Sequence, residues 1–190
     1  MVKAELTDKN LVVDILTYSF ADNKSVNYVI KQDRFRAKRL EKLMEYSFDY
    51  CRLFGEVYLS DDKKACALLV LPDKKKTTLK SIVLDIRLAW SCVGVSNLKK
   101  VLEREARIKG LHPNAIMYYL WFIGVQPGDQ NKGVGSSLLK QLIQRSCELQ
   151  RPMYLETSTL KNIPWYEKFG FSIYHELDFG YKLFCLKREC

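Results

Sequence analysis

The sequence predicts an α+β fold in which a mixed β-sheet is flanked by helices. Two short apolar runs, residues 56–60 and 65–71, bracket a polar turn and indicate an antiparallel β-hairpin early in the chain. Later, an apolar run at 117–125 precedes a helical pattern and a second apolar run at 153–158, as in a strand–helix–strand unit. At 190 residues, the chain is expected to be one domain, 1–190, whose core needs neither disulfides nor metal.

The other elements follow from hydrophobic spacing and from residues that begin or end helices. Before the hairpin, the sequence predicts a strand at 2–6, a helix after Thr7 or Asp8, a loop at 21–26, and a helix at about 33–54 that Gly55 ends. After the hairpin, it predicts helices at 77–90 and 96–110, separated by Gly94, and two closing strands at 172–176 and 181–187.

A glycine-rich loop follows the strand at 117–125 and opens a helix. It consists of the turn Pro127-Gly128-Asp129, then Gln130, Gly133 and Gly135. Glycines at a helix start allow several backbone N–H groups to converge on one anion, and the helix dipole also favours negative charge there. The loop lacks the Gly-Lys-Ser/Thr of a P-loop and the third glycine of the dinucleotide fingerprint. We therefore expect it to bind a different phosphate group.

Two motifs resemble the GNAT superfamily of N-acetyltransferases. The pattern Gln-x-x-Gly-x-Gly at residues 130–135, after an apolar strand, is similar to the coenzyme A loop of that superfamily. The pattern Asn-x-x-x-Tyr-Glu-Lys-x-Gly-Phe at 162–171, between two strands, is similar to the later half of its core. The resemblance covers a coenzyme A-binding core at about 117–178, and upstream only the layout is compatible. It implies that 1–190 is a single acetyltransferase domain.

The resemblance implies acetyl-CoA as co-substrate, no metal, and a sheet whose fourth and fifth strands splay apart. The thioester arm would pair with the fourth strand as an added strand would, and Gly124 would supply the bulge that opens the splay. The loop amides would hold the pyrophosphate, and Asn162 would bond the pantetheine arm unless it only caps a helix. The implied cofactor-binding residues are Phe122, Ile123, Gly124, Val125, Gln130, Asn131, Lys132, Gly133, Val134, Gly135, Ser136, Asn162 and Tyr166.

Acetyl transfer needs a neutral amine, a polarised carbonyl and a proton for the leaving thiolate. By resemblance Tyr166 is the general acid, although it could be a packing aromatic. Many relatives place a glutamate on the fourth strand, but residues 117–121 offer none, so Glu156 is the candidate catalytic carboxylate. It could act as a base through a water, as an acceptor for the substrate ammonium, or only structurally. Further candidates are Tyr118 and Tyr119 as substrate contacts, and His112 and His175 as bases.

Composition favours a reduced, cytoplasmic location. The six cysteines are scattered, form no CxxC motif and sit in apolar patterns, where a thiol behaves as a small hydrophobe. No apolar run reaches the roughly 18 residues of a membrane span, and the N-terminus lacks a secretory segment. We therefore expect no membrane partner.

The net charge of +9 is densest at residues 31–42, with a second basic cluster at 74–76. A nucleic-acid face is one interpretation. A second interpretation is a solvated helix face, because Phe35 and Leu40 give the first stretch a core-facing side. A third is that the positive charge attracts polyanionic coenzyme A. We expect no specific nucleic-acid partner.

The leading hypothesis is therefore an N-acetyltransferase. It would transfer an acetyl group from acetyl-CoA to the primary amine of a small molecule by direct attack. One alternative is a non-catalytic acyl-CoA-binding sensor or interaction module on the same fold, because the strand base is missing. The other is a basic nucleic-acid-binding protein. A monomer and a homodimer both remain open, and the helices at 77–110 are either a substrate-side insertion or packing filler.

Overall fold

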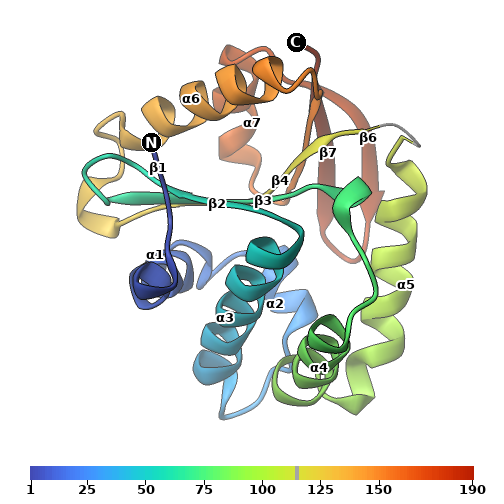
Figure 1. The fold of residues 1–190 in the computed structure, drawn as a ribbon. Coiled ribbons are helices and arrows are strands. Elements are labelled where there is room, and N and C mark those ends of the chain that lie inside the picture. Colours follow the sequence, from blue (N-terminus) through green and yellow to red (C-terminus); the bar gives the residue numbers. More distant parts are fainter. Residues whose placement is uncertain (114–115) are drawn as a thin grey trace.

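The computed structural model describes residues 1–113 and 116–190. Its strands form one mixed sheet in the order β1-β2-β3-β4-β5-β7-β6 (Figure 1). Neighbouring strands are antiparallel except β4 and β5, which run parallel. The predicted α+β class is confirmed. The strands are β1 (Val2–Lys3), β2 (Gly55–Leu59), β3 (Ala65–Val70), β4 (Tyr118–Val125), β5 (Met153–Thr157), β6 (Ser172–Asp178) and β7 (Lys182–Arg188).

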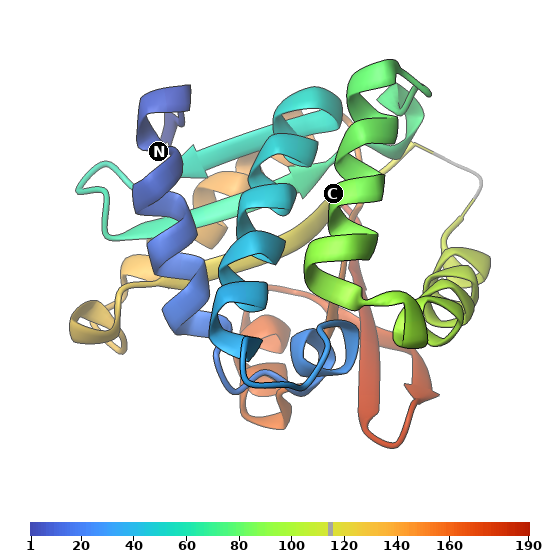
Figure 2. The ribbon, with the colours of Figure 1, turned by 90° about the horizontal axis from the view of Figure 1, so that it is seen from below.

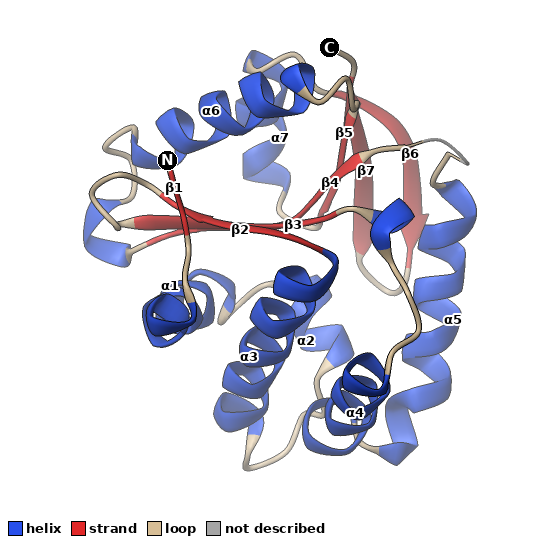
Figure 3. Ribbon diagram, in the orientation of Figure 1, coloured by secondary structure: helices blue, strands red, loops and turns tan. Residues whose placement is uncertain are grey.

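Helices cover both faces of this sheet (Figure 3). The helices are α1 (Lys9–Phe20), α2 (Lys24–Val29), α3 (Arg36–Phe54), α4 (Leu79–Leu88), α5 (Val95–Leu111), α6 (Val134–Glu148) and α7 (Ile163–Lys168). One apolar core lies between the sheet and α1 and α3, and a second lies between the sheet and α6 and α7. Helix α5 stands beside β6 and β7, where Ile108 packs against Leu177 and Leu183.

Strands β4 and β5 separate soon after they begin. Their register contains only the pairs Tyr118–Met153 and Tyr119–Tyr154. Beyond these pairs β5 bonds to β7 on its other side, while β4 continues along β3. The expected splay between the fourth and fifth strands is therefore confirmed, and it leaves one edge of β4 without a strand partner among the described residues.

The bulge in β4 lies at Trp121, not at Gly124 as the sequence suggested. Leu69 pairs with Leu120 and Leu68 with Phe122, so Trp121 is the extra residue. Gly124 is needed for a different reason. A Cβ atom there would lie 2.9 Å from the Ser19 Oγ and 3.1 Å from a Leu16 methyl group, so α1 can approach β4 only where a side chain is missing.

Local boundaries differ from the expectations at several places. Residues 21–26 were expected to be a loop, but α2 begins within them because the Asn23 side chain accepts a 3.0 Å hydrogen bond from the Val26 N–H. The expected helix at 77–90 ends at Leu88 and continues as a π-helical turn, Ala89–Val93. The first strand is shorter than expected, β6 extends two residues further, and β7 is displaced by one residue.

Within the described residues, no single helix is long and apolar enough to cross a membrane. The segments Leu79–Val93 and Val95–Leu111 meet that test only as a pair, by length and composition, and they are bent by 116° relative to each other.

Candidate active site

A cleft of about 1490 Å³ runs through the splay between β4 and β5. At one end it is lined by the loop before α6. Along its length it is lined by β4, β5 and the start of α7, and at the other end by α3 and α5. The strand splay thus opens a space that elements on both faces of the sheet line.

The loop before α6 has free backbone donors directed at this cleft. Gly133 adopts a φ of 82°, a left-handed conformation that suits glycine, and precedes the helix without a side-chain cap. The first intrahelical bond runs from the Ser137 N–H to the Gly133 oxygen at 2.9 Å. The amides ahead of Ser137 therefore have no helical acceptor, which makes this helix start suited to an anion.

The predicted loop residues divide into two groups. Gln130, Asn131, Gly133, Gly135 and Ser136 line the cleft, as do the four β4 residues at 122–125. The side chains of Lys132 and Val134 lie outside it, because Lys132 reaches Asp129 and Val134 packs against the core under α6. Those two positions can contribute only backbone amides.

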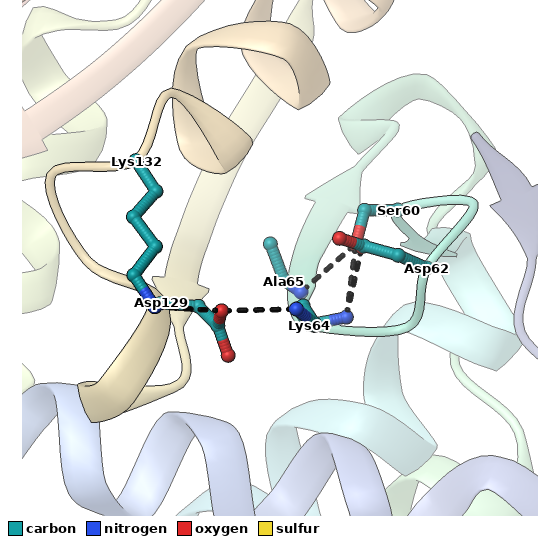
Figure 4. Close-up of polar contacts among 6 residues, drawn as sticks. All are labelled: Ser60, Asp62, Lys64, Ala65, Asp129 and Lys132. Carbon is teal, nitrogen blue, oxygen red and sulfur yellow. Dashed lines mark hydrogen bonds and ion pairs between the residues drawn. The ribbon is translucent and has the colours of Figure 1, made fainter.

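Lys64 in the turn of the β2–β3 hairpin and Lys132 in the loop itself both pair with Asp129 (Figure 4). Lys64 Nζ lies 3.0 Å and Lys132 Nζ 3.4 Å from Asp129 Oδ1. The hydrogen bond from Lys64 is the main reason why the pKa of Asp129 lies below its usual value. The hairpin turn is itself ordered by the Ser60 hydroxyl, which accepts bonds from the Lys64 and Ala65 amides. The ion pair of Lys64 with Asp129 therefore attaches the loop to the hairpin.

A tryptophan outside the predicted set connects α7 to the loop. Trp165 Nε1 donates a 2.9 Å hydrogen bond to Ser136 Oγ. Since Ser136 lies 29 residues earlier in the chain, no local pattern could have revealed the contact.

Tyr166 lies in the wall of the cleft near the splay. It is only 5% exposed, and its ring packs against Trp165 and Phe171. Burial raises the pKa of the Tyr166 phenol above its usual value, and no described residue hydrogen-bonds its hydroxyl. Asn162 stands at the start of α7 without a capping bond from its side chain, which lines the cleft. Both side chains are therefore available to a ligand.

Glu156 lies inside the cleft and forms hydrogen bonds with two other cleft residues. Its side chain is 7% exposed, and its Oε1 lies 3.0 Å from His112 Nε2. Its Oε2 accepts a hydrogen bond from the Tyr119 hydroxyl. Burial, and next the Glu156 charge, hold the pKa of Tyr119 well above its usual value, so Tyr119 stays a neutral donor. The structure thus joins two separate candidates, Glu156 and His112, into one network.

The two remaining candidates lie elsewhere. Tyr118 is fully buried on the opposite side of β4 and donates a 2.7 Å hydrogen bond to Glu56, so it cannot contact a substrate in the cleft. His175 is exposed on β6 and is not part of the cleft wall.

Aromatic residues from two elements form the far end of the cleft. Tyr46 and Tyr50 on α3 lie with ring centroids 6.3 Å and 5.6 Å from Trp121 on β4. Tyr46 donates a 2.8 Å hydrogen bond to Asp85 on α4. The sequence predicted only a helix at about 33–54, and the part that Tyr46 and Tyr50 have in the cleft became visible only with the fold.

Residues 92–173 match a family described as an acetyltransferase (GNAT) domain. Among solved structures, histone acetyltransferase HPA2 and related acetyltransferase from Corynebacterium glutamicum is 20% identical with a TM-score of 0.72, over 100% of this chain and 95% of that one. The C-terminal condensation domain of Ebony, in complex with beta-alanyl-dopamine, is 10% identical with a TM-score of 0.70, over 100% and 97%.

Mosquito arylalkylamine N-acetyltransferase like 5b is 16% identical with a TM-score of 0.57, over 99% of this chain and 98% of that one. At these identities, the solved structures establish the fold, and the family match covers the strand–loop–helix core that surrounds the cleft. Residues 92–173 therefore match the GNAT acetyltransferase domain, and the fold of the whole chain is similar to that of solved GNAT acetyltransferases.

Proposed function

We propose that the protein transfers the acetyl group of acetyl-CoA to the primary amine of a small molecule. One observation carries the proposal: a single cleft joins an anion-binding loop, an unpaired strand edge, a buried tyrosine and an aromatic wall. An acceptor of modest size suits that wall. The arylalkylamine N-acetyltransferase and the beta-alanyl-dopamine complex among the similar folds point in the same direction.

Each part of the cleft has a task in this reaction. The amides of 130–136 bind the pyrophosphate of coenzyme A. The free edge of β4 at 122–125 pairs with the amides of the thioester arm, and the Asn162 amide bonds the same arm. These contacts fix the thioester carbonyl in the splay, where an amine entering from the far end can attack it.

The acceptor nitrogen attacks the carbonyl carbon, and the carbon–sulfur bond breaks. Tyr166 donates its phenolic proton to the departing thiolate, since burial keeps the phenol protonated at neutral pH. The amine nitrogen gives up one proton as the amide forms. The attacking amine must also be neutral, so a proton acceptor at the far side of the cleft assists the reaction.

We assign that acceptor to His112 and a positioning role to Glu156. Both oxygens of Glu156 already bond to neighbours, His112 and Tyr119, which leaves the carboxylate poorly placed to take a proton from the amine. With His112 protonated at Nε2 and donating to Glu156, its Nδ1 remains free as the acceptor. This assignment supplies the base that the fourth strand lacks and weakens the case for a non-catalytic sensor.

The basic stretch on α3 offers little to a nucleic acid. Arg36 bonds to the Asn27 side chain, and Arg39 forms an ion pair with Asp33 at 2.8 Å. Lys42 is paired with Glu45 at 2.8 Å. Because these side chains already have intramolecular partners, we propose no specific nucleic-acid partner.

Acetyl-CoA is expected to stabilise the protein by about 2.7 kcal/mol at 100 times its dissociation constant. Gly135→Leu should remove that gain, because a Cβ there already lies 3.0 Å from a Val125 methyl group and a longer side chain fills the phosphate site. The measurement is the shift in thermal midpoint with acetyl-CoA, followed by thiol release with a panel of amines.

Gly128→Leu is the matched control, since nothing lies within 4 Å of a Cβ at Gly128. It should keep the full ligand shift. An unchanged shift in Gly135→Leu would remove the loop from cofactor binding. A wild-type protein that binds acetyl-CoA but releases no thiol with any amine in the panel would favour the sensor hypothesis.

A further inference from the structure

Helix α4 and the π-helical turn after it expose an apolar stripe that the proposed reaction does not use. The stripe consists of Leu79, Ile82, Val83, Ile86 and Trp90, spaced three or four residues apart so that they share one helix face. All five are exposed, Leu79 by 84% and Trp90 by 77%. Solvent-facing helix positions are normally polar, so this face is unusual.

The opposite face of α4 is firmly attached to the protein. Ser81 is buried, and Leu84 and Leu88 are partly buried. Asp85 accepts the hydrogen bond from Tyr46 on α3. Figure 2 shows α1, α3 and α4 side by side, with α4 on the outer side of α3. The packed contacts hold the helix in one orientation, so the apolar stripe points away from the body.

Positive charge surrounds this stripe. Between residues 73 and 90 the basic residues are Lys74, Lys75, Lys76, Lys80 and Arg87. In the described part of the chain none of these five forms an ion pair with a carboxylate. The two acidic residues of the segment are engaged elsewhere, Asp73 with Arg151 at 2.6 Å and Asp85 with Tyr46. The net field at the stripe is therefore positive.

The surface continues from α4 onto α3. A small groove beside the stripe is lined by Trp90 together with Phe35, Lys38 and Lys42. Phe35 is half exposed. Aromatic and basic side chains therefore alternate across both elements.

We propose that this face docks on an anionic lipid surface. A helix with an apolar face, flanking lysines and arginines and a tryptophan lies in the interface of a bilayer, its apolar side chains among the acyl chains and its cations at the headgroups. A second copy of the chain fits less well. A two-fold interface would place Lys76, Lys80 and Arg87 opposite the same residues of the other copy. Such docking is peripheral and needs no membrane-spanning segment.

Docking would bring one wall of the cleft to the lipid surface. Lys75 and Leu88 belong to the same segment as the stripe and also line the cleft. The inference itself does not depend on the acetyl-transfer proposal, because it concerns binding and not turnover.

The test is co-sedimentation of the full chain with two vesicle types, pure phosphatidylcholine and a mixture containing about 30% phosphatidylserine. The protein should sediment with the anionic vesicles and remain in solution with the neutral ones, and added salt should release it. Ile86→Glu should abolish sedimentation, because it places a charge in the apolar stripe. Lys80→Gln and Arg87→Gln should each weaken binding about fivefold.

Matched controls separate this surface from general properties of the chain. Leu6→Glu changes an apolar residue that is 65% exposed on the N-terminal 3₁₀ turn, and Lys140→Gln removes a charge on α6. Both variants should bind as the wild type does. Thermal midpoints of all variants establish that they are folded. The fluorescence of Trp90 should shift to the blue with anionic vesicles, and Trp90→Phe should remove that shift.

Three results would overturn the proposal. The first is that the wild-type protein does not sediment with anionic vesicles. The second is that Leu6→Glu and Ile86→Glu lose vesicle binding to the same extent. The third is that the wild type does not bind vesicles but forms a dimer that Ile86→Glu dissociates. The last result would assign the stripe to a second copy of the chain.

Discussion

Replacing Tyr166 with phenylalanine is expected to lower turnover by about 10²–10⁴-fold, the usual effect of a positioned general acid. The substitution removes only the hydroxyl, which no described residue bonds, and keeps the ring in contact with Trp165 and Phe171. Because the proton is needed only as the thiolate leaves, the loss should appear in kcat, while the affinity for acetyl-CoA barely changes. Steady-state thiol release and the ligand-induced thermal shift measure the two quantities.

The pH profile adds a second readout for Tyr166. Burial disfavours the phenolate, which raises the pKa, so the protonated form persists to higher pH than in a free tyrosine, whose pKa is about 10. Deprotonation of Tyr166 should therefore not lower the wild-type kcat at any pH below about 10.

Tyr174→Phe is the matched control for Tyr166→Phe. The Tyr174 hydroxyl is also buried and has no partner among the described residues, but Tyr174 lies on β6 outside the cleft wall. Its loss should leave turnover intact. Equal turnover of Tyr166→Phe and the wild type on a good acceptor would exclude the proposed acid. A defect confined to cofactor binding would make Tyr166 a contact for the pantetheine arm instead.

Replacing His112 with glutamine is expected to lower kcat/KM by about 10²–10⁴-fold at neutral pH, because glutamine cannot accept the proton of the amine. Its amide can still bond to Glu156, so the network around the cleft should persist. Activity of the variant should also recover as the pH approaches the pKa of the acceptor amine, since the amine is then already neutral.

Two further variants distinguish His112 from its partner. Glu156→Gln keeps hydrogen-bonding groups beside His112 and removes only the charge, so it should cause a smaller loss of kcat/KM than His112→Gln. His175→Gln changes an exposed histidine and should have no effect. If Glu156→Gln were inactive while His112→Gln kept full activity, Glu156 would be the direct base. Full activity of both variants would indicate that the acceptor enters the cleft in its neutral form.

Local patterns in the sequence were sufficient for most of the architecture. Hydrophobic spacing predicted the hairpin of β2 and β3, the long helix α3 and the order of strand, loop and helix around Gly133. Each of these depends on residues that are neighbours along the chain. The anion-binding character of the loop is likewise a local property, because the left-handed conformation at Gly133 and the free amides of a helix start are set within a few residues.

Where local signals compete, sequence interpretation failed. The polar composition of 21–26 indicated a loop, but the cap provided by Asn23 begins a helix there. Gly124 suggested a bulge because glycine often marks one. In the structure, the missing side chain at Gly124 instead allows α1 to pack closely against β4. The bulge at Trp121 depends on the register between β3 and β4, and a register is a property of two strands, which the sequence of one strand does not reveal.

By itself, the sequence predicted the fold class and the glycine-rich loop before a helix, because each rests on residues close together in the chain. Its resemblance to the GNAT superfamily added Tyr166 and Asn162 as candidates. The tertiary structure alone decided the rest. It brings His112 into a hydrogen bond with Glu156, which lies 44 residues later in the chain. It also brings Trp165 into a hydrogen bond with Ser136, which lies 29 residues earlier. It also left the apolar stripe of α4 facing outward. The physical reason is that hydrogen-bond partners and solvent exposure depend on how strands pair and helices pack, and these contacts join residues that no short motif can contain.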